Sequence, residues 1–307
     1  MSERIIMEQI GVIGLGRMGS AIAQRMASQG RSVLGWTRSG RRVDGVDSVH
    51  DLGTLVEKSD TLILSLFDDE AVATVLDALL KLDLTGKQII ESSTVTPTNL
   101  TDRITRIEAQ GASAVDAPIS GGPELVQAGK CGIFIGGGDG AARRAQDCLT
   151  SISDRIFHVG PLGTGLVMKV INNGMLQAYF NGLADLLPMA KRAGLPLENV
   201  LRILCGGPAG IPMVTDRIPK VLGQDSEVGF PLNAIFKDNE VFQKVLASYG
   251  LTSPMLIHFS KLKPTIIEAG LWDRDPAILI NLAYDDGEES SDESLEKSIG
   301  SSRHQTD

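Results

Sequence analysis

Three closely spaced glycines follow a short apolar segment near the beginning of the chain. The sequence Gly14-Leu15-Gly16-Arg17-Met18-Gly19 comes directly after Gln9–Ile13 and leads into the amphipathic stretch Ser20–Gln29. In such a strand–turn–helix unit the first glycine allows a tight turn, the second lets a pyrophosphate approach the backbone, and the third lets the helix pack on the strand. Free amides at the helix N-terminus attract the phosphates. The motif therefore predicts a dinucleotide-binding loop.

Apolar segments recur through the first 160 residues and alternate with helix-like stretches. This alternation is typical of a parallel, doubly wound sheet with helices on both faces. The expected strands are Gln9–Ile13, Ser32–Trp36, Thr61–Leu66, Gln88–Glu91, Ala112–Val115 and Gly132–Ile135. The expected helices between them include Ser20–Gln29, Glu70–Lys81 and Thr98–Gln110. Residues 1–160 are therefore expected to form an α/β domain of the Rossmann type.

The pattern changes after Gly160. One helix-like segment of 31 residues runs from Leu162 to Arg192, and a helix of that size would extend about 45 Å. The segments after it are also helix-like, namely Leu197–Leu204, Pro212–Leu222, Ala234–Ser248 and Ser253–Ala269. We expect residues 161–284 to form an all-helical domain that serves substrate binding and dimerisation.

The acidity of the chain is concentrated at its end. The formal net charge is −9, but eight acidic and two basic residues lie between Asp285 and Asp307, so residues 1–284 carry a net charge of only −3. The body of the chain has no basic stripe, and no nucleic-acid partner is expected. Residues 285–307 are rich in Gly, Ser and acids and almost devoid of apolar groups, which predicts a disordered tail.

The end of the second expected strand indicates which dinucleotide is preferred. NAD sites usually carry an Asp or Glu about 20 residues after the glycines to bind the ribose hydroxyls. Here the strand is followed by Thr37, Arg38 and Ser39, with Arg41 and Arg42 close behind. A guanidinium can bind a 2′-phosphate through paired hydrogen bonds, and the hydroxyls add donors. These residues favour NADP over NAD, although they could also form a solvated surface loop.

A second motif, Asp116-Ala117-Pro118-Ile119-Ser120-Gly121-Gly122, follows the fifth expected strand. Ligands of open α/β sheets bind at the carboxyl ends of the strands. A serine followed by two glycines can bring a hydroxyl and exposed amides onto one anion, such as a substrate carboxylate. A flexible turn without a ligand is the alternative interpretation.

A third motif precedes and enters the long helix. Gly160-Pro161-Leu162-Gly163-Thr164-Gly165 is followed by Lys169, Asn172 and Asn173. Lys169 and Asn173 are four residues apart and share a helix face, where an amine and an amide can hold a hydroxyl or carbonyl between them. The alternative is a lysine that snorkels to the surface from an apolar helix. The neighbouring amides disfavour it, because buried amides need partners.

These motifs together resemble the β-hydroxyacid dehydrogenase family, which includes 3-hydroxyisobutyrate dehydrogenases and tartronate semialdehyde or glyoxylate/succinic semialdehyde reductases. Each motif is weak alone, but they occur in the family's order from Gly14 to Lys237 and cover most of the chain. The segments that carry the resemblance are residues 14–19, Glu91–Pro97, residues 116–122, residues 160–173 and Phe236–Val241.

The resemblance implies an oxidoreductase that transfers a hydride between nicotinamide and a small 3-hydroxy acid or semialdehyde carboxylate. It implies that Lys169 is the general acid/base, which accepts the hydroxyl proton in oxidation and donates a proton in reduction. It also implies several binding roles: Asn173 beside the lysine, Ser120, Gly121 and Gly122 on the substrate carboxylate, Leu66, Phe67 and Thr94 along the cofactor, and Lys237 over nicotinamide and substrate.

Two other functions remain open at this point. Imine reductases share the architecture but generally lack the lysine, and so do non-catalytic NADP-binding scaffolds of this fold. The presence of Lys169, Asn173 and Ser120 favours chemistry on CH–OH groups. The related 6-phosphogluconate dehydrogenases carry a histidine where this chain has Asn172, which argues against that substrate.

The remaining features set the expected context. Cys131, Cys148 and Cys205 form no CxxC pair, and their odd number favours reduced thiols over a disulfide framework or a metal site. The first residues lack the apolar core of a secretory signal, and charged and amide residues interrupt the apolar stretch 162–190. We expect a cytoplasmic protein without a membrane span or metal, and the resemblance implies a homodimer or homotetramer.

Overall fold

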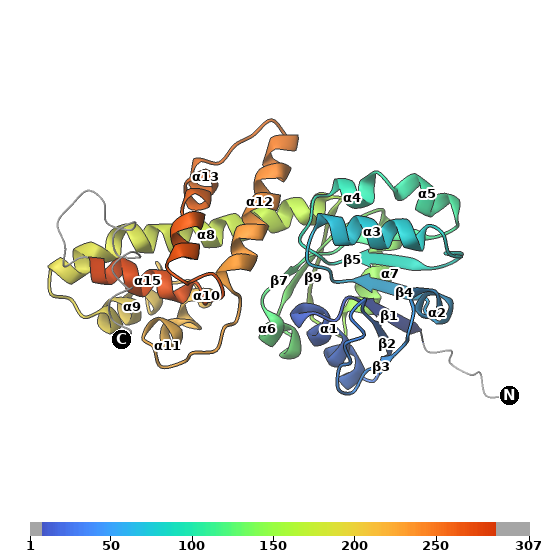
Figure 1. Cartoon of the computed structure of the whole chain (residues 1–307), viewed down its shortest axis with the longest axis horizontal. Coiled ribbons are helices and arrows are strands. Elements are labelled where there is room, and N and C mark those ends of the chain that lie inside the picture. The colour runs from blue at the N-terminus through green and yellow to red at the C-terminus, as the bar shows by residue number, and fades with distance from the viewer. Residues whose placement is uncertain (1–7, 287–307) are drawn as a thin grey trace. The chain divides into compact units, whose positions relative to one another are not determined.

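The computed structural model describes residues 8–286 of the chain (Figure 1). The chain divides into two compact units between Asn173 and Gly174. Within the described residues, the first unit contains a nine-stranded sheet with helices, and the second contains helices only. The expected α/β domain followed by an all-helical domain is therefore confirmed.

Six parallel strands form the main part of the sheet, in the spatial order β3-β2-β1-β4-β5-β6. From β1 the chain adds β2 and β3 on one side, and it then returns to add β4, β5 and β6 on the other side. Such a reversal places a ligand crevice at the carboxyl ends of the strands. The six strands are β1 (Gln9–Ile13), β2 (Ser32–Trp36), β3 (Asp47–Ser48), β4 (Thr61–Leu64), β5 (Gln88–Glu91) and β6 (Ser113–Asp116).

The last three strands make the sheet mixed. β8 (Gly132–Gly136) runs antiparallel to both β6 and β7 (Ile119–Ser120), and β9 (Arg155–Gly160) runs parallel to β8. The helix before β8, α6 (Pro123–Gln127), has five residues and spans about 7.5 Å. It is too short to carry the chain back along a strand, so β8 runs in the opposite direction. The expectation of a wholly parallel sheet is therefore wrong at this end.

Alternate residues of the central strands face opposite sides of the sheet. Val12 and Ile63 pack in one apolar cluster with α1, α6 and α7, whereas Leu62 and Leu64 pack in another with α2, α3, α4 and α5. Figure 1 shows α3 and α5 along this second face. The helices are α1 (Arg17–Ser28), α2 (Leu52–Lys58), α3 (Asp69–Leu79), α4 (Thr98–Thr101), α5 (Ile104–Ala109) and α7 (Asp139–Leu149).

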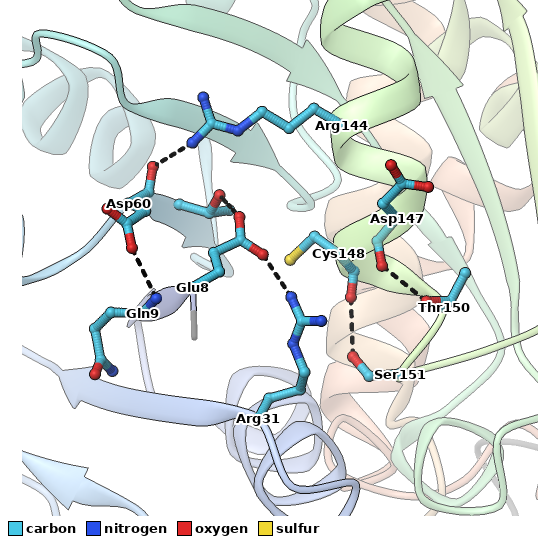
Figure 2. A network of polar contacts seen from close by, with 10 residues as sticks. Glu8, Gln9, Arg31, Asp60, Arg144, Asp147, Cys148, Thr150 and Ser151 are labelled. Carbon is cyan, nitrogen blue, oxygen red and sulfur yellow. Dashed lines mark hydrogen bonds and ion pairs between the residues drawn. The ribbon is translucent and has the colours of Figure 1, made fainter. Parts of the chain in front are cut away.

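A polar network joins the amino ends of β1 and β4 to the helices (Figure 2). Arg144 of α7 donates to the backbone carbonyl of Asp60 at 2.9 Å, and the Asp60 carboxylate accepts the amide of Gln9 at 2.8 Å. Glu8 forms an ion pair with Arg31 beside them. This network lies at the edge of the sheet opposite the carboxyl ends, so it holds the strands in place and takes no part in the candidate site.

The cysteines are free thiols, with Cys131 and Cys148 buried and Cys205 half-buried. Burial raises the pKa of Cys148 to about 12 and also raises that of Cys131, so both stay protonated and unreactive at neutral pH. Residues 8–286 contain no group of three or more His, Cys, Asp or Glu side chains that could hold a metal. No helix among those residues has the length and apolar character needed to cross a membrane.

The second unit packs around two apolar clusters. Leu183 and Leu187 of α8 join α9, α10, α11 and α15 in the first, and Phe236 of α12 stacks on Phe259 in the second, with ring centroids 4.7 Å apart. The helices are α8 (Thr164–Arg192), α9 (Leu197–Cys205), α10 (Pro212–Thr215), α11 (Ile218–Val221), α12 (Leu232–Ser248), α13 (Pro254–Lys261), α14 (Lys263–Glu268) and α15 (Ala277–Asp285).

Proline divides two of the helices expected in this unit. Pro219 stands at the start of α11 and Pro264 at the start of α14. Proline has no N–H to continue the hydrogen-bond ladder of a preceding helix. The continuous helices expected at Pro212–Leu222 and Ser253–Ala269 are therefore wrong, and each is a pair of short helices.

Helix α8 belongs to both units, because the division after Asn173 falls inside it. The domain boundary expected between residues 160 and 161 stays a prediction. Asp285 is the last residue of α15 and Asp286 is its C-cap, so these two residues are not part of a disordered tail. The rest of the expected tail, residues 287–307, lies outside the described residues.

Candidate active site

The carboxyl ends of the parallel strands bring several loops to one edge of the first unit. In the register of the sheet, Ile13 is the partner of Leu64, Leu64 is the partner of Glu91, and Glu91 is the partner of Asp116. The glycine loop after β1 and the segments after β4, β5 and β6 therefore begin side by side. These segments contain most of the site residues expected in the first unit.

The glycine loop has the geometry that a close backbone approach requires. Gly14 has a φ of 94°, and a Cβ there would lie 2.3 Å from the backbone oxygen of Ser65. A Cβ on Gly19 would lie 1.9 Å from the oxygen of Gly14, so α1 packs against the loop without side-chain space. Gly16 is the N-cap of α1, and a Cβ on it would have no atom within 4 Å. The first turn of α1 therefore presents its amides to open space, as a pyrophosphate would need.

The residues after β2 lie at the surface. Thr37 is half-buried, whereas Arg38, Ser39, Arg41 and Arg42 are exposed. Among the described residues none of these arginines forms an ion pair. Their guanidinium groups are thus available to an anion.

The segments after β4 and β5 are joined by a side chain that the sequence did not single out. The backbone N–H of Leu66 donates to Oγ of Ser93 at 2.8 Å. Ser93 is buried, Leu66 and Thr94 are half-buried, and Phe67 is 60% exposed. The expected cofactor-lining residues therefore belong to one hydrogen-bonded pair of loops, and the aromatic ring of Phe67 is exposed there.

Ser120 and the two glycines after it form the end of β7 and the turn into α6. Gly121 has a φ of 126°, which favours glycine, and Gly122 is the N-cap of α6. The exposed carboxylate of Glu124 lies against Gly122, 2.3 Å from where a Cβ would stand. Because Glu124 is a flexible surface side chain, it would have to turn away for a substrate carboxylate to use these amides.

Lys169 is buried in the first unit. Its side chain leaves α8 toward β7, and the residue is only 6% exposed. Nζ donates to the backbone carbonyl of Ile119 at 2.6 Å. This contact places the amine next to Ser120 in the chain of β7. A lysine that snorkels to the surface does not fit this burial, so that alternative is excluded.

Asn172 connects the expected substrate and catalytic residues, a role that we had not assigned to it. Its Nδ2 donates to Oγ of Ser120 and to Oδ1 of Asn173, both at 2.9 Å. Because Ser120 accepts this bond, its own hydroxyl hydrogen is left to donate elsewhere. Lys169, Asn172 and Asn173 lie within about one turn of α8, so one helix holds the whole group against β7.

Two further acids at this edge were not expected to matter. Asp116 accepts the backbone N–H groups of Gly163 and Leu166 at the start of α8, at 2.6 and 2.8 Å. Glu91 accepts the N–H of Ser93 at 2.6 Å. Each acid directly follows an apolar run of a buried strand and begins one of the segments that carry the family resemblance, residues 91–97 and 116–122, but neither signal indicates which groups the acid contacts.

Lys237 belongs to the second unit. It lies on α12, and its Nζ is 2.6 Å from Oδ1 of Asp238. Its expected place over nicotinamide and substrate stays a prediction, because it depends on how the two units meet.

Two family models match successive parts of the chain. The NAD binding domain of 6-phosphogluconate dehydrogenase matches residues 9–160. The NAD-binding domain of NADP-dependent 3-hydroxyisobutyrate dehydrogenase matches residues 163–283. Together they span nearly all of the described residues.

Several curated proteins are similar over most of their length. A probable 3-hydroxyisobutyrate dehydrogenase of Mycobacterium tuberculosis is 26% identical over 264 residues, which cover 82% of this chain and 90% of that protein. The NAD-dependent L-serine dehydrogenase of Pseudomonas aeruginosa is 27% identical over 293 residues, with 90% and 98% covered. The 2-(hydroxymethyl)glutarate dehydrogenase of Eubacterium barkeri is 28% identical over 240 residues, with 75% and 79% covered.

Solved structures share the fold at lower identity. A 3-hydroxyisobutyrate dehydrogenase of M. tuberculosis with L-serine has a TM-score of 0.80 at 24% identity and covers 90% of this chain and 98% of its own. An imine reductase from a Pseudomonas species has a TM-score of 0.56 at 21% identity, with 89% and 98% covered. The overall fold is therefore common to dehydrogenases and imine reductases and does not separate their reactions.

Proposed function

This chain belongs to the β-hydroxyacid dehydrogenase family and binds a nicotinamide dinucleotide, and we propose that it is an NADP-dependent dehydrogenase or reductase of small hydroxy acids. The proposed reaction interconverts a 3-hydroxy acid and the corresponding semialdehyde carboxylate. Lys169 is the proposed general acid/base.

One observation carries this proposal, namely the surroundings of the Lys169 amine. It is buried, it donates to the carbonyl of Ile119 at 2.6 Å, and it lies one helical turn before Asn173 on the same helix. Burial of a lysine is costly, and a purely structural position would be filled more easily by an apolar residue. An amine held beside an amide pair and a serine suits transfer of a proton to or from a substrate oxygen.

The residues divide the work as follows. The amides of residues 14–19 and the α1 N-terminus would hold the pyrophosphate, with Leu66, Phe67 and Thr94 beside the cofactor. When bound, the nicotinamide ring supplies or accepts the hydride. Lys169 takes the hydroxyl proton in oxidation and returns a proton to the developing alkoxide in reduction, assisted by Asn173. A positioned acid/base of this kind contributes about 10²–10⁴ in rate.

The substrate carboxylate would lie on Ser120 and the amides of Gly121 and Gly122. Asn172 supports this role, because it occupies an acceptor site of the Ser120 hydroxyl and leaves its hydrogen for the ligand. Lys237 would close over substrate and nicotinamide from the second unit. The preference for NADP over NAD rests on Arg38, with Thr37 and Ser39, and on the absence of an acid directly after β2.

We also propose a cytoplasmic homodimer or homotetramer, as the resemblance to the family implies. Two other functions are outcomes of the tests below. An imine reductase of the same fold would reduce cyclic imines in preference to semialdehydes, and a non-catalytic scaffold would bind NADPH without consuming it.

The function is tested by following NADPH and NADH absorbance with a panel of substrates. The panel contains semialdehyde carboxylates, their uncharged aldehyde analogues, 3-hydroxy acids with the oxidised cofactors, and cyclic imines. We expect turnover of carboxylated aldehydes with NADPH, and Ser120→Ala should raise KM for them without changing NADPH affinity. Equal rates for charged and uncharged aldehydes would contradict the carboxylate site, and turnover of imines alone would replace the proposal by the imine reductase.

A further inference from the structure

A buried pair of carboxylates lies at the candidate site but has no part in the proposed chemistry. Glu91 ends β5, Asp116 ends β6, and the two are direct partners in the parallel register. Each is 1% exposed. Two acidic side chains next to each other and out of water need specific compensation, because an uncompensated buried charge is costly.

The compensation for Asp116 comes from the start of α8. Its Oδ1 accepts the N–H of Gly163 at 2.6 Å and its Oδ2 accepts the N–H of Leu166 at 2.8 Å. Glycines make room for this contact: a Cβ would lie 2.3 Å from Oδ1 at Gly136 and 2.8 Å from Oδ2 at Gly165. The glycine-rich turn before α8 therefore serves to seat the helix on the Asp116 carboxylate.

This seat determines where Lys169 stands. Lys169 is three residues after Leu166, and its amine bonds Ile119, which is three residues after Asp116. The first turn of α8 is thus fixed to the β6–β7 segment at two points. If Asp116 released the two amides, the start of α8 would lose one of its two attachments to this segment. Lys169 would then shift together with the helix.

Glu91 is bonded differently, and the charged groups that act on it are both acids. Its Oε1 accepts the N–H of Ser93 at 2.6 Å, whereas Oε2 is buried without a hydrogen-bond partner among the described residues. The pKa of Glu91 is raised to about 7, mainly by burial and also by the negative charges of Asp116 on β6 and Asp69 on α3, against the lowering effect of the hydrogen bonds from Ser93. Burial also raises the pKa of Asp116 to about 6, against the lowering effect of the Gly163 and Leu166 amides.

We propose that Asp116 is a positioning residue for Lys169, and that Glu91 must carry a proton so that Asp116 can stay ionised against α8. The pair then acts as one coupled unit that is competent when it carries a single proton, on Glu91. With two protons, Asp116 becomes a poorer acceptor for two amides. With none, two adjacent charges repel each other in a low-dielectric site. The role of Lys169 itself rests on the proposed function.

The proposal predicts a bell-shaped pH profile for kcat. Turnover should fall below about pH 6 and above about pH 7 in the wild-type protein, where the pair gains its second proton or loses its last one. Glu91→Gln keeps a neutral side chain at every pH. It should therefore retain wild-type kcat at pH 6.5 and lose the alkaline fall. If the alkaline fall persists unchanged in Glu91→Gln, the role given to Glu91 is wrong.

Asp116→Asn tests the positioning role at constant shape. The amide offers one oxygen and turns its NH₂ group toward the second backbone N–H. We expect kcat to fall about ten- to a hundredfold, as for a reacting group displaced by around an ångström, with unchanged NADPH affinity. The matched control is Asp51→Asn, which removes the carboxylate that caps α2 through Thr54. That variant should lose some stability and keep its kcat, so helix capping alone does not explain the effect.

Hydrogen exchange needs no substrate, so it tests the positioning role of Asp116 separately from the proposed function. Hydrogen exchange of the Leu166 amide, followed by NMR, should accelerate in Asp116→Asn, and in the wild type it should accelerate above about pH 7 beyond the intrinsic rate. Glu91→Gln should abolish that extra acceleration. If Leu166 exchange is the same in all three proteins, or if Asp116→Asn keeps wild-type kcat, the proposal is overturned. Absence of turnover in every protein with this exchange pattern intact would instead contradict the proposed function.

Discussion

Lys169 and Arg38 are both cations of the first unit, but their surroundings differ. Lys169 is 6% exposed and donates to a backbone carbonyl, whereas Arg38 is exposed at the end of β2 and has no ion pair among the described residues. A buried amine next to other polar groups suits proton transfer, and an exposed guanidinium suits phosphate binding. The two residues therefore support different halves of the proposed function.

Replacing Arg38 with alanine tests the preference for NADP. A charge-assisted hydrogen bond contributes about 1.5–3 kcal/mol, so Arg38→Ala should weaken NADPH binding about ten- to a hundredfold. NADH binding should barely change, because NADH has no 2′-phosphate. Fluorescence titration with both cofactors measures this difference. The matched control is Arg143→Ala, an exposed arginine on α7 of the same unit, which should change neither affinity. Equal losses for NADPH and NADH would contradict the assignment.

The glycine loop could be predicted residue by residue from the sequence. Each of the three glycines has a local reason for being glycine. In the structure Gly14 has a positive φ, Gly16 borders open space, and Gly19 lies in close contact with the backbone. The partners of Asp116 and the bond from Asn172 to Ser120 could not be predicted in this way. Asp116 and Asn172 bond residues about 50 positions away in the chain, and spacing alone does not indicate which strand end meets which helix.

At the scale of elements, the buried strands were predicted best. β1, β2 and β5 begin and end at the residues expected, because each has an apolar centre and lies between turns. β3 and β7 contain two residues each, too few to form a pattern, and β9 is mostly exposed and lacks alternation. Helices were predicted less well. The single helix expected at Thr98–Gln110 is divided into α4 and α5, and no proline in the sequence indicates the division.

The carboxylate at the end of β5 makes a prediction about the stability of the sheet. Glu91 has an ordinary pKa of 4.5, which burial raises to about 7 in the folded protein. Between these values the folded state holds a proton that the unfolded state has released, so stability falls as pH rises from about 4.5 to about 7. A difference of this size corresponds to about 3 kcal/mol.

Glu91→Gln should remove this part of the pH dependence, because glutamine does not titrate. Urea unfolding at pH 5 and pH 8 should show that the wild type loses about 2–3 kcal/mol more than the variant between the two values. Asp116 contributes in the same direction in both proteins, because burial raises its pKa as well. Parallel stability curves for the two proteins would show that Glu91 does not carry the raised pKa.

At the scale of the whole molecule, charge and apolar content are unevenly distributed. Residues 285–307 hold eight of the 38 acidic residues and almost no apolar groups, so they have little to bury in a core. Deleting residues 288–307 should leave the melting temperature and kcat essentially unchanged. Thermal unfolding and the NADPH assay on the truncated chain check this. A clear drop in melting temperature would mean that the segment packs on the body.

The central claim is that Lys169 transfers the substrate proton, and single-turnover hydride transfer measures it most directly. Lys169→Ala removes the proton donor and leaves the glycine loop intact, so stopped-flow NADPH oxidation should slow by about 10²–10⁴ while titration gives near-normal NADPH affinity. The matched control is Lys87→Ala, which removes a lysine of the same unit that also donates to a backbone carbonyl, that of Ser59 at 2.7 Å. This control should transfer hydride at the wild-type rate. Near-wild-type hydride transfer in Lys169→Ala would contradict the account.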